Sequence, residues 1–317
     1  MKILVTPTSL CRDREAPSLD PLRAYADELV FNDTGRPMTE HELIEALPGV
    51  DAVVAGLDDY TAAVLRSADA LRVISRYGVG VNNIDLAVAA ERGVVVTRTP
   101  GANALAVAEL AIGLTFSAAR SIPRLDAGVR AGDWLRGDGL ELTGRTFGVI
   151  GFGAIGRLVA ERARGIGMRV VAYDPMLPDA VFEGAGVERA DLDDLCRASD
   201  VVSAHVPLLD STRHLLDARR LALLRPDAIV INTARGGLLD EAAALAALES
   251  GHLHAVAIDV YETEPPSASV LVGHPRVIST PHSGAHTREA IVRTATQAVA
   301  DVLAVLRGQA TPNAVTT

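Results

Sequence analysis

Aromatic residues are scarce in this sequence, at 3% of 317 residues, and there are only two cysteines. So few aromatic rings argue against a base-stacking surface for single-stranded nucleic acid. Positive charge is also in short supply: 30 basic residues stand against 40 acidic ones, and the net charge of -10 disfavours binding to a phosphate backbone. Cys11 and Cys196 lie far apart and outside any C-x-x-C pattern. We therefore expect a reducing, cytoplasmic setting and no disulfide framework.

Long hydrophobic runs are missing as well. The apolar stretch at the N-terminus is too short for a signal peptide. The most membrane-like segment, Ala104–Ala119, contains Glu109 and many small residues, which favours a helix buried between protein surfaces. No His, Cys and Asp residues occur at the spacing of zinc ligands, so no metal site is predicted. We expect neither a membrane nor a nucleic acid as a partner.

Short β-branched runs alternate with helix-length segments along the chain, which is typical of parallel α/β folds. The chain length favours two domains, and Pro100 and Gly101 suggest a boundary near Thr99–Asn103. A final amphipathic helix is expected over roughly Ala290–Arg307. The first series predicts strands at Lys2–Thr6, Asp51–Ala55, Arg72–Ser75 and Val94–Thr97, with helices such as Thr39–Leu47 and Thr61–Ser67 between them. The second series predicts strands at Thr146–Gly151, Arg169–Tyr173, Asp200–Ala204, Ala228–Asn232, Ala255–Asp259 and Val277–Thr280.

A glycine-rich loop follows the first strand of the second series. Its sequence, Gly151-Phe152-Gly153-Ala154-Ile155-Gly156, fits the G-x-G-x-x-G pattern and precedes a helical segment. In that setting the glycines permit a tight turn, close approach of a pyrophosphate, and close packing of helix on strand. The next predicted strand ends at Asp174, where an acid should meet the adenosine ribose and repel a 2′-phosphate. The pattern therefore predicts NAD, rather than NADP, as the cofactor.

Three later segments place a reactive side chain just after a predicted strand, namely Arg235, Glu264 and His282. Because ligands of open α/β sheets bind beyond the carboxyl ends of the strands, we expect the three to converge. Arginine offers a planar fork to a carboxylate, and histidine can exchange a proton with a carbonyl oxygen. A glutamate beside the histidine favours the imidazolium. Each residue alone could be structural, but together they favour reduction of a 2-keto acid.

Taken together, these motifs resemble the D-isomer-specific 2-hydroxyacid dehydrogenase family, and most of all its D-3-phosphoglycerate dehydrogenase branch. The resemblance extends from about residue 50 to about residue 290. It also includes the segments Arg76–Asp85, Thr99–Asn103, Asn232–Gly237 and Ala257–Tyr261. It implies two Rossmann-like, doubly wound parallel-sheet domains. The NAD-binding domain, residues 101–285, would be inserted into a discontinuous substrate-binding domain of residues 1–100 plus 286–317.

The resemblance also implies roles for individual residues. Arg235, Glu264 and His282 match the catalytic set of the family. The substrate-binding residues would be Arg76, Val79, Gly80, Asn103, Arg235 and His282, with Val79 and Gly80 acting through backbone N–H groups. The cofactor-binding residues would be Gly151, Gly153, Ala154, Ile155, Gly156, Asp174, Val206, Pro207, Thr233, Ala234, Asp259, Gly284 and Ala285. A homodimer formed through the nucleotide domain is expected.

The sequence departs from the phosphoglycerate branch in two places. Ala55-Gly56 stands where many of those enzymes have an Arg-Ser pair facing the substrate, although Arg76 matches an arginine frequent in that branch. The sequence ends soon after the helix that finishes near Arg307, so we expect a short form without the C-terminal regulatory domain.

The substrate remains open at this stage. 3-Phosphoglycerate is the leading candidate, followed by glyoxylate or hydroxypyruvate. Phosphite oxidation is less favoured, because enzymes of that type have a lysine where this chain has Val79. A different class of protein, a non-catalytic NAD-binding regulator of the corepressor kind, could share the fold. The intact set of Arg235, Glu264 and His282 speaks against that alternative.

Overall fold

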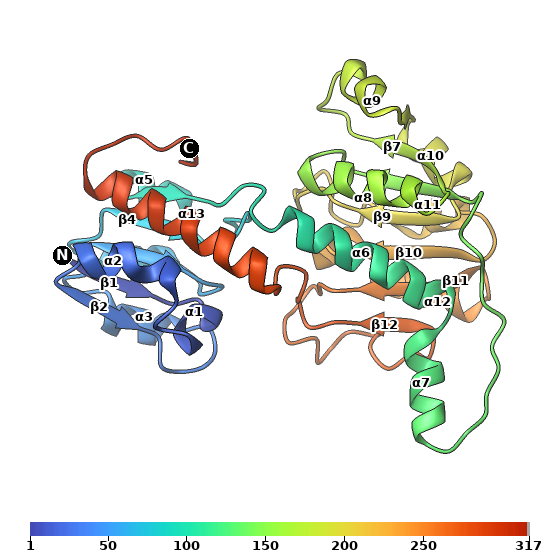
Figure 1. Cartoon of the computed structure of the whole chain (residues 1–317), viewed down its shortest axis with the longest axis horizontal. Coiled ribbons are helices and arrows are strands. Elements are labelled where there is room, and N and C mark those ends of the chain that lie inside the picture. The colour runs from blue at the N-terminus through green and yellow to red at the C-terminus, as the bar shows by residue number, and fades with distance from the viewer. Residues whose placement is uncertain (316–317) are drawn as a thin grey trace. The chain divides into compact units, whose positions relative to one another are not determined.

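The computed structural model describes residues 1–315 and contains two compact units, each built on a parallel β-sheet (Figure 1). One unit combines Met1–Asn103 with His286–Thr317, and the other is Ala104–Ala285. Thr316 and Thr317, the end of the expected substrate domain, lie outside the described residues. Both units are α/β, as the alternation of strand and helix patterns predicts.

The discontinuous unit contains a five-stranded sheet in the order β2-β1-β3-β4-β5, with every pair parallel. This is one of the two common doubly wound orders, and its switch point lies between β1 and β3. The strands are β1 (Lys2–Val5), β2 (Glu28–Phe31), β3 (Ala52–Ala55), β4 (Val73–Arg76) and β5 (Val95–Thr97). The helices are α1 (Thr8–Arg12), η1 (Pro17–Leu19), α2 (Asp20–Tyr25), α3 (Glu40–Ala46), α4 (Ala62–Ser67), α5 (Leu86–Glu91) and α13 (Arg288–Leu306).

Helix α13 returns to this unit from the far end of the chain and covers one face of its sheet. Its apolar stripe, including Ala295, Val299 and Val302, is buried with Ile3 and Val5 of β1. Its first turn is capped by the Thr287 side chain. The predicted amphipathic helix is therefore confirmed, with its start two residues earlier than expected.

The second unit contains a seven-stranded sheet in the order β12-β11-β10-β9-β6-β7-β8, again with every pair parallel. Numbered from β6, this is the 3-2-1-4-5-6 order of dinucleotide-binding folds with one strand added. Its strands are β6 (Thr146–Ile150), β7 (Arg169–Tyr173), β8 (Glu188–Arg189), β9 (Val201–Ala204), β10 (Ala228–Asn232), β11 (Leu253–Ile258) and β12 (Val277–Ser279). Its helices are α6 (Ala104–Ala119), α7 (Ile122–Arg130), α8 (Ala154–Gly165), α9 (Asp179–Ala185), α10 (Leu192–Ala198), α11 (Ala218–Leu223), η2 (Gly236–Leu238) and α12 (Glu241–Glu249).

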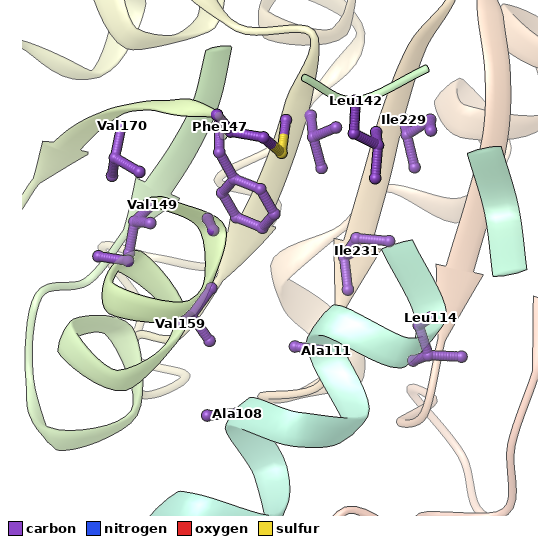
Figure 2. Close-up of a cluster of buried hydrophobic side chains, with 14 of the residues drawn as sticks. Ala108, Ala111, Leu114, Leu142, Phe147, Val149, Val159, Val170, Ile229 and Ile231 are labelled. Carbon is purple, nitrogen blue, oxygen red and sulfur yellow. The ribbon is translucent and has the colours of Figure 1, made fainter. Parts of the chain in front are cut away.

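The core on one face of this sheet is formed largely by α6 and α8. Figure 2 shows Ala108 and Ala111 of α6 among the side chains of Val159, Phe147 and Ile231, all of which are buried. The small alanines allow α6 to lie close to α8 and to the strands beneath. The segment that looked most membrane-like is thus a buried helix of this core, as predicted.

Two strands were not predicted, and both lie at the edge of a sheet. β2 is partly exposed along its length, and β8 has two residues, both exposed. β8 contains no apolar residue, and the apolar run of β2, Leu29–Phe31, has only three residues, which is short for a strand. The ten predicted strands are all present, with ends that differ by at most two residues.

Among residues 1–315, no single helix is long and apolar enough to cross a membrane. The bent pair of α6 and α7, at 63°, meets that test by length and composition only. Cys11 and Cys196 are both free thiols.

Candidate active site

The glycine loop lies at the switch point of the seven-stranded sheet, between β6 and α8. Gly151 has a φ of 93°, a conformation that side chains other than glycine rarely adopt. A Cβ atom on Gly156 would lie 1.9 Å from the Gly151 carbonyl oxygen, so no larger residue fits there. A Cβ atom on Gly153 would meet nothing within 4 Å. The loop is therefore tight on its inner side and open at Gly153, next to the start of α8 at Ala154 and Ile155.

The residues around this loop fit a dinucleotide. Both carboxylate oxygens of Asp174 are held by backbone N–H groups, from Phe152 at 2.9 Å and from Met176 at 3.0 Å. Val206, followed by Pro207, packs against the loop, because its Cγ1 atom lies 2.7 Å from the position of a Cβ on Gly151. The hydroxyl of Thr233 is buried and has no hydrogen-bond partner within residues 1–315. An open backbone at a helix N-terminus, an oriented acid and an unused hydroxyl are what NAD requires.

Glu264 and His282, which are 18 residues apart in the sequence, are in direct contact. His282 Nδ1 lies 2.8 Å from Glu264 Oε2. About a third of each side chain is exposed. No described residue bonds His282 Nε2, so this nitrogen is available to a ligand. The pair has the geometry of an imidazole oriented by a carboxylate.

The backbone at His282 is strained, with a φ of 51°. The loop is held by Asp259, which is buried and follows β11. Its carboxylate accepts hydrogen bonds from the Ser283 N–H at 2.8 Å, the Gly284 N–H at 2.8 Å and the Thr280 hydroxyl at 2.5 Å. Asp259 and Gly284, expected as cofactor contacts, therefore also fix the segment that carries His282.

Arg235 follows β10, and its loop is organised by a side chain that the sequence analysis did not single out. Asn232 donates to the Arg235 carbonyl at 2.8 Å and accepts from the Ala234 N–H at 3.1 Å. A strand-end asparagine is a known signal for such a turn. A Cβ atom on Gly236 would lie 1.9 Å from the Tyr261 carbonyl carbon, so the Arg235 loop packs directly on the loop that carries Glu264.

Charges couple the three reactive residues. Burial lowers the pKa of the Arg235 guanidinium, and the Glu264 carboxylate opposes that shift. Burial raises the pKa of Glu264, but the hydrogen bond and charge of His282, the Tyr261 N–H and Arg235 together outweigh it. The net effect is a lowered pKa for Glu264. Glu264 therefore stays ionised at neutral pH and accepts from His282 Nδ1.

Tyr261 is a second residue that the sequence analysis missed. Its N–H donates to Glu264 Oε1 at 3.2 Å, and its hydroxyl donates to the Thr280 carbonyl at 2.9 Å. The residue thus connects the loop of Glu264 to the loop of His282. An aromatic residue in a loop is not by itself a signal for such a role.

The other expected substrate residues belong to the discontinuous unit. Arg76 is buried at the end of β4, and its guanidinium donates to the Tyr77 carbonyl beneath Gly78. No described residue accepts a hydrogen bond from the N–H of Val79 or of Gly80. The side-chain oxygen of Asn103 is buried and has no hydrogen-bond partner in residues 1–315. This unit therefore offers unused donors after β4 and an unused acceptor near residue 100.

Metal ligands are not grouped in the described part of the chain. Within residues 1–315 no set of three or more His, Cys, Asp or Glu side chains could hold a metal ion.

His205 is the histidine next to the glycine loop. Its Nε2 atom lies 2.9 Å from the Ser203 hydroxyl, and burial lowers its pKa to about 3. His205 therefore stays neutral at physiological pH and is not suited to donate a proton as an acid.

Strand order, glycine loop and Asp174 define a dinucleotide-binding α/β protein, and comparison with known proteins gives its family. Residues 112–284 match the NAD-binding domain of the D-isomer specific 2-hydroxyacid dehydrogenases. The chain is 43% identical over 304 residues to a D-3-phosphoglycerate dehydrogenase of Methanocaldococcus jannaschii. This match covers 93% of the chain and 58% of that protein. It is 41% identical over 282 residues to a hydroxypyruvate reductase of Thermotoga maritima, which covers 86% of this chain and 91% of that protein.

Solved structures agree with these sequence matches. The apo-structure of D-lactate dehydrogenase from Escherichia coli superposes with a TM-score of 0.88 at 31% identity, over 100% of both chains. This chain belongs to the D-isomer specific 2-hydroxyacid dehydrogenase family and contains its NAD-binding domain. It spans little more than half the length of the phosphoglycerate dehydrogenases that it matches, 58% in the first case.

Proposed function

We propose that this chain catalyses reversible, NAD(H)-dependent interconversion of a small 2-keto acid and its D-2-hydroxy acid. The observation that supports this most directly is the 2.8 Å contact between Glu264 and His282, in loops that follow strands of the same sheet as the glycine loop. Arg235 lies in the neighbouring loop and is coupled electrostatically to Glu264. A proton donor, its orienting carboxylate and a cationic fork are the groups that keto-acid reduction requires.

Each residue has a defined part in this mechanism. NADH, when bound, supplies the hydride for the C2 carbon. His282 donates a proton from Nε2 to the carbonyl oxygen in reduction and takes it back in oxidation. Glu264 accepts from Nδ1 and stabilises the imidazolium. Arg235 binds the substrate carboxylate through its guanidinium.

The leading substrate is 3-phosphoglycerate, and the alternative is hydroxypyruvate or glyoxylate. The first is supported by the 43% identity to a D-3-phosphoglycerate dehydrogenase and by Arg76. The second is supported by the match to a hydroxypyruvate reductase, which covers 91% of that protein, and by Ala55-Gly56 at the end of β3. Neither Ala55 nor Gly56 has a side chain that could bind a phosphate.

A substrate panel tests the proposal. NADH consumption would be followed with hydroxypyruvate, phosphohydroxypyruvate, glyoxylate and pyruvate, and NADH formation with 3-phosphoglycerate. A kcat/KM at least tenfold higher for the phosphorylated acids would support the first substrate, and the reverse order would support the second. Binding of NADH without turnover of any acid would refute the enzyme and favour the non-catalytic regulator.

We further propose a homodimer formed through the NAD-binding unit. Helix α7 and the chain that follows it, residues 122–141, extend away from the sheet of this unit (Figure 1). We call this segment the arm. It exposes Val129, Trp134 and Leu135, side chains that a second copy of the chain would cover.

A further inference from the structure

An arginine lies beside Asp174, the acid expected to meet the adenosine ribose. β8 pairs in parallel with β7, and the pairing places Arg189 opposite Ala172, two residues before Asp174. From there its Nη2 atom reaches the Asp174 carbonyl oxygen, at 3.5 Å. The guanidinium thus lies at the end of the sheet where the adenosine ribose is expected to bind. NADP differs from NAD by one phosphate on the 2′ position of that ribose.

Three other side chains determine where this guanidinium lies. Its Nη1 atom donates to the carboxylate of Asp179, in the first turn of α9. Its central carbon lies 5.3 Å from the centroid of the Phe182 ring. Phe182 stacks on Phe152 of the glycine loop, with ring centroids 4.9 Å apart and planes inclined by 11°. The Phe152 N–H donates to Asp174, so these contacts run from the glycine loop to β8.

This cluster carries a net negative charge. Asp174 and Asp179 each carry a carboxylate, and Arg189 carries one positive charge. A guanidinium is the side chain best suited to bind a phosphate, and it would favour NADP if it were unpaired. Here the Asp179 carboxylate accepts from one of its two terminal nitrogens, Nη1.

We propose that Asp179 masks Arg189, and that this pair is a second determinant, in addition to Asp174, of discrimination between NADH and NADPH. Asp174 repels the 2′-phosphate, and Asp179 withholds the cation that would attract it. The proposal rests on the NAD-binding unit and on Asp174 as its ribose-facing acid. It is independent of which acid substrate the enzyme takes.

A purely structural ion pair would behave differently. Asp179 is 72% exposed and Arg189 39% exposed, and exposed pairs contribute little to stability. Removing Asp179 should therefore leave the melting temperature nearly unchanged. The predicted effect is confined to binding of the phosphorylated cofactor, which a structural role would not change.

The test measures dissociation constants for NADH and NADPH by calorimetry, on the full chain without substrate. In Asp179→Asn we expect NADPH to bind about three- to tenfold more tightly, as for one ordinary hydrogen bond, with NADH changed less than twofold. Asp174→Ser should also improve NADPH binding, and Asp174→Ser/Asp179→Asn should improve it further. Adding Arg189→Met to that double variant should abolish the part of the gain due to Asp179.

A matched control comes from the same unit. Asp194 pairs with Arg197 in α10 at 2.7 Å, and Asp194→Asn makes the same change of net charge. It should leave both constants unchanged. The proposal is overturned if Asp194→Asn has the same effect, if Asp179→Asn has none, or if its gain survives Arg189→Met. Absence of NADH binding in the wild type would refute it together with the nucleotide site, whereas lack of turnover with intact binding would refute only the proposed reaction.

Discussion

His282 can act as an acid–base because one of its ring nitrogens is held and the other is not. Nδ1 is bonded to Glu264 at 2.8 Å, and no described residue bonds Nε2. The pKa of Glu264 is lowered, because the hydrogen bond from His282 and its neighbours outweighs the opposing effect of burial. A lowered pKa keeps this carboxylate ionised at neutral pH and also in the acidic range where a free glutamate takes up a proton. The contact weakens only as the pH falls through the lowered pKa.

The pH dependence of both directions should reveal this pairing. Keto-acid reduction requires a protonated imidazole, so its rate should fall with rising pH, and oxidation should show the opposite trend. Glu264→Gln removes the charge that stabilises the imidazolium, so the fall in reduction should begin at lower pH. The matched control is Glu262→Gln. Glu262 lies two residues before Glu264 and also pairs with a histidine, His214, at 2.8 Å. Identical profiles for wild type and Glu264→Gln would contradict the coupling.

Removing the imidazole should affect chemistry but not cofactor binding. In His282→Ala we expect kcat to fall by roughly 10²–10⁴-fold, the usual contribution of a positioned acid–base. NADH affinity, measured by calorimetry, should stay within a few-fold of wild type because the glycine loop is untouched. Near-normal turnover in this variant would exclude His282 from the mechanism.

Arg235 is expected to act through the shape of its guanidinium as well as its charge. Arg235→Lys keeps the charge but loses the fork, so kcat/KM for the keto acid should fall roughly ten- to a hundredfold. Arg219→Lys is a suitable control, because Arg219 forms an exposed pair with Asp193 and should tolerate the change. If the Arg235→Lys enzyme keeps most of its kcat/KM, another group binds the carboxylate.

The sequence predicts the reactive residues of the site better than it predicts the residues that orient them. Arg235, Glu264 and His282 are reactive types that follow apolar runs, so their meeting at one sheet edge could be expected. The contacts of Asn232 and Tyr261 depend on bonds from side chains to loop backbone. Loop conformation leaves no periodic pattern in the sequence, so these contacts required the structure.

In the glycine loop and α8, one glycine is required for folding and another leaves room for a ligand. A Cβ on Gly156 would collide with the Gly151 carbonyl, at 1.9 Å, so that glycine is needed for the protein to fold. A Cβ on Gly153 would meet no protein atom within 4 Å, and the backbone φ of −71° is outside the left-handed region that favours glycine. The protein alone therefore gives no steric reason for glycine at 153, which is consistent with close approach of a pyrophosphate.

Three alanine substitutions should make that separation measurable. Gly156→Ala should lower the melting temperature or prevent folding. Gly153→Ala should melt like the wild type but bind NADH at least tenfold more weakly, because a methyl group would occupy the cofactor's place. Gly165→Ala, at the other end of α8, meets nothing within 4 Å and should change neither property. Unchanged NADH affinity in Gly153→Ala would argue against cofactor binding at this loop.

The elements themselves were predictable where burial is complete. The central strands β3, β4, β6, β9 and β10 are buried throughout and appear in the sequence as apolar runs. The start of α3 was also predicted, at Thr39, and the structure shows that Thr39 and Glu42 form a capping box there. Glu28–Phe31 and Glu188–Arg189 form strands only because a neighbouring strand pairs with them. Such context does not show in a short window of sequence.

For the whole molecule, the arm is the feature that a single chain does not explain. Val129, Trp134 and Leu135 are 57%, 80% and 56% exposed, although the unit behind them has a well-packed core. Exposed apolar groups on one projecting segment are typical of an interface. In a symmetric dimer each chain contributes its arm to the interface, so the total buried surface area is twice that of one arm.

Assembly through the arm can be tested with the protein's own reporter, since Trp134 is the only tryptophan in the chain. Light scattering during size-exclusion chromatography should give twice the mass of one chain, and the tryptophan emission should be that of a buried indole. Val129→Glu places a charge in the expected interface, so it should halve the mass and shift the tryptophan emission to longer wavelength. Because Val129 is exposed on the single chain, the substitution should not change the melting temperature of that chain itself. Val270→Glu changes a similarly exposed valine outside the arm and should do neither. A monomeric wild type with red-shifted emission, or a Val129→Glu variant that stays dimeric, would place the oligomer contact elsewhere or remove it.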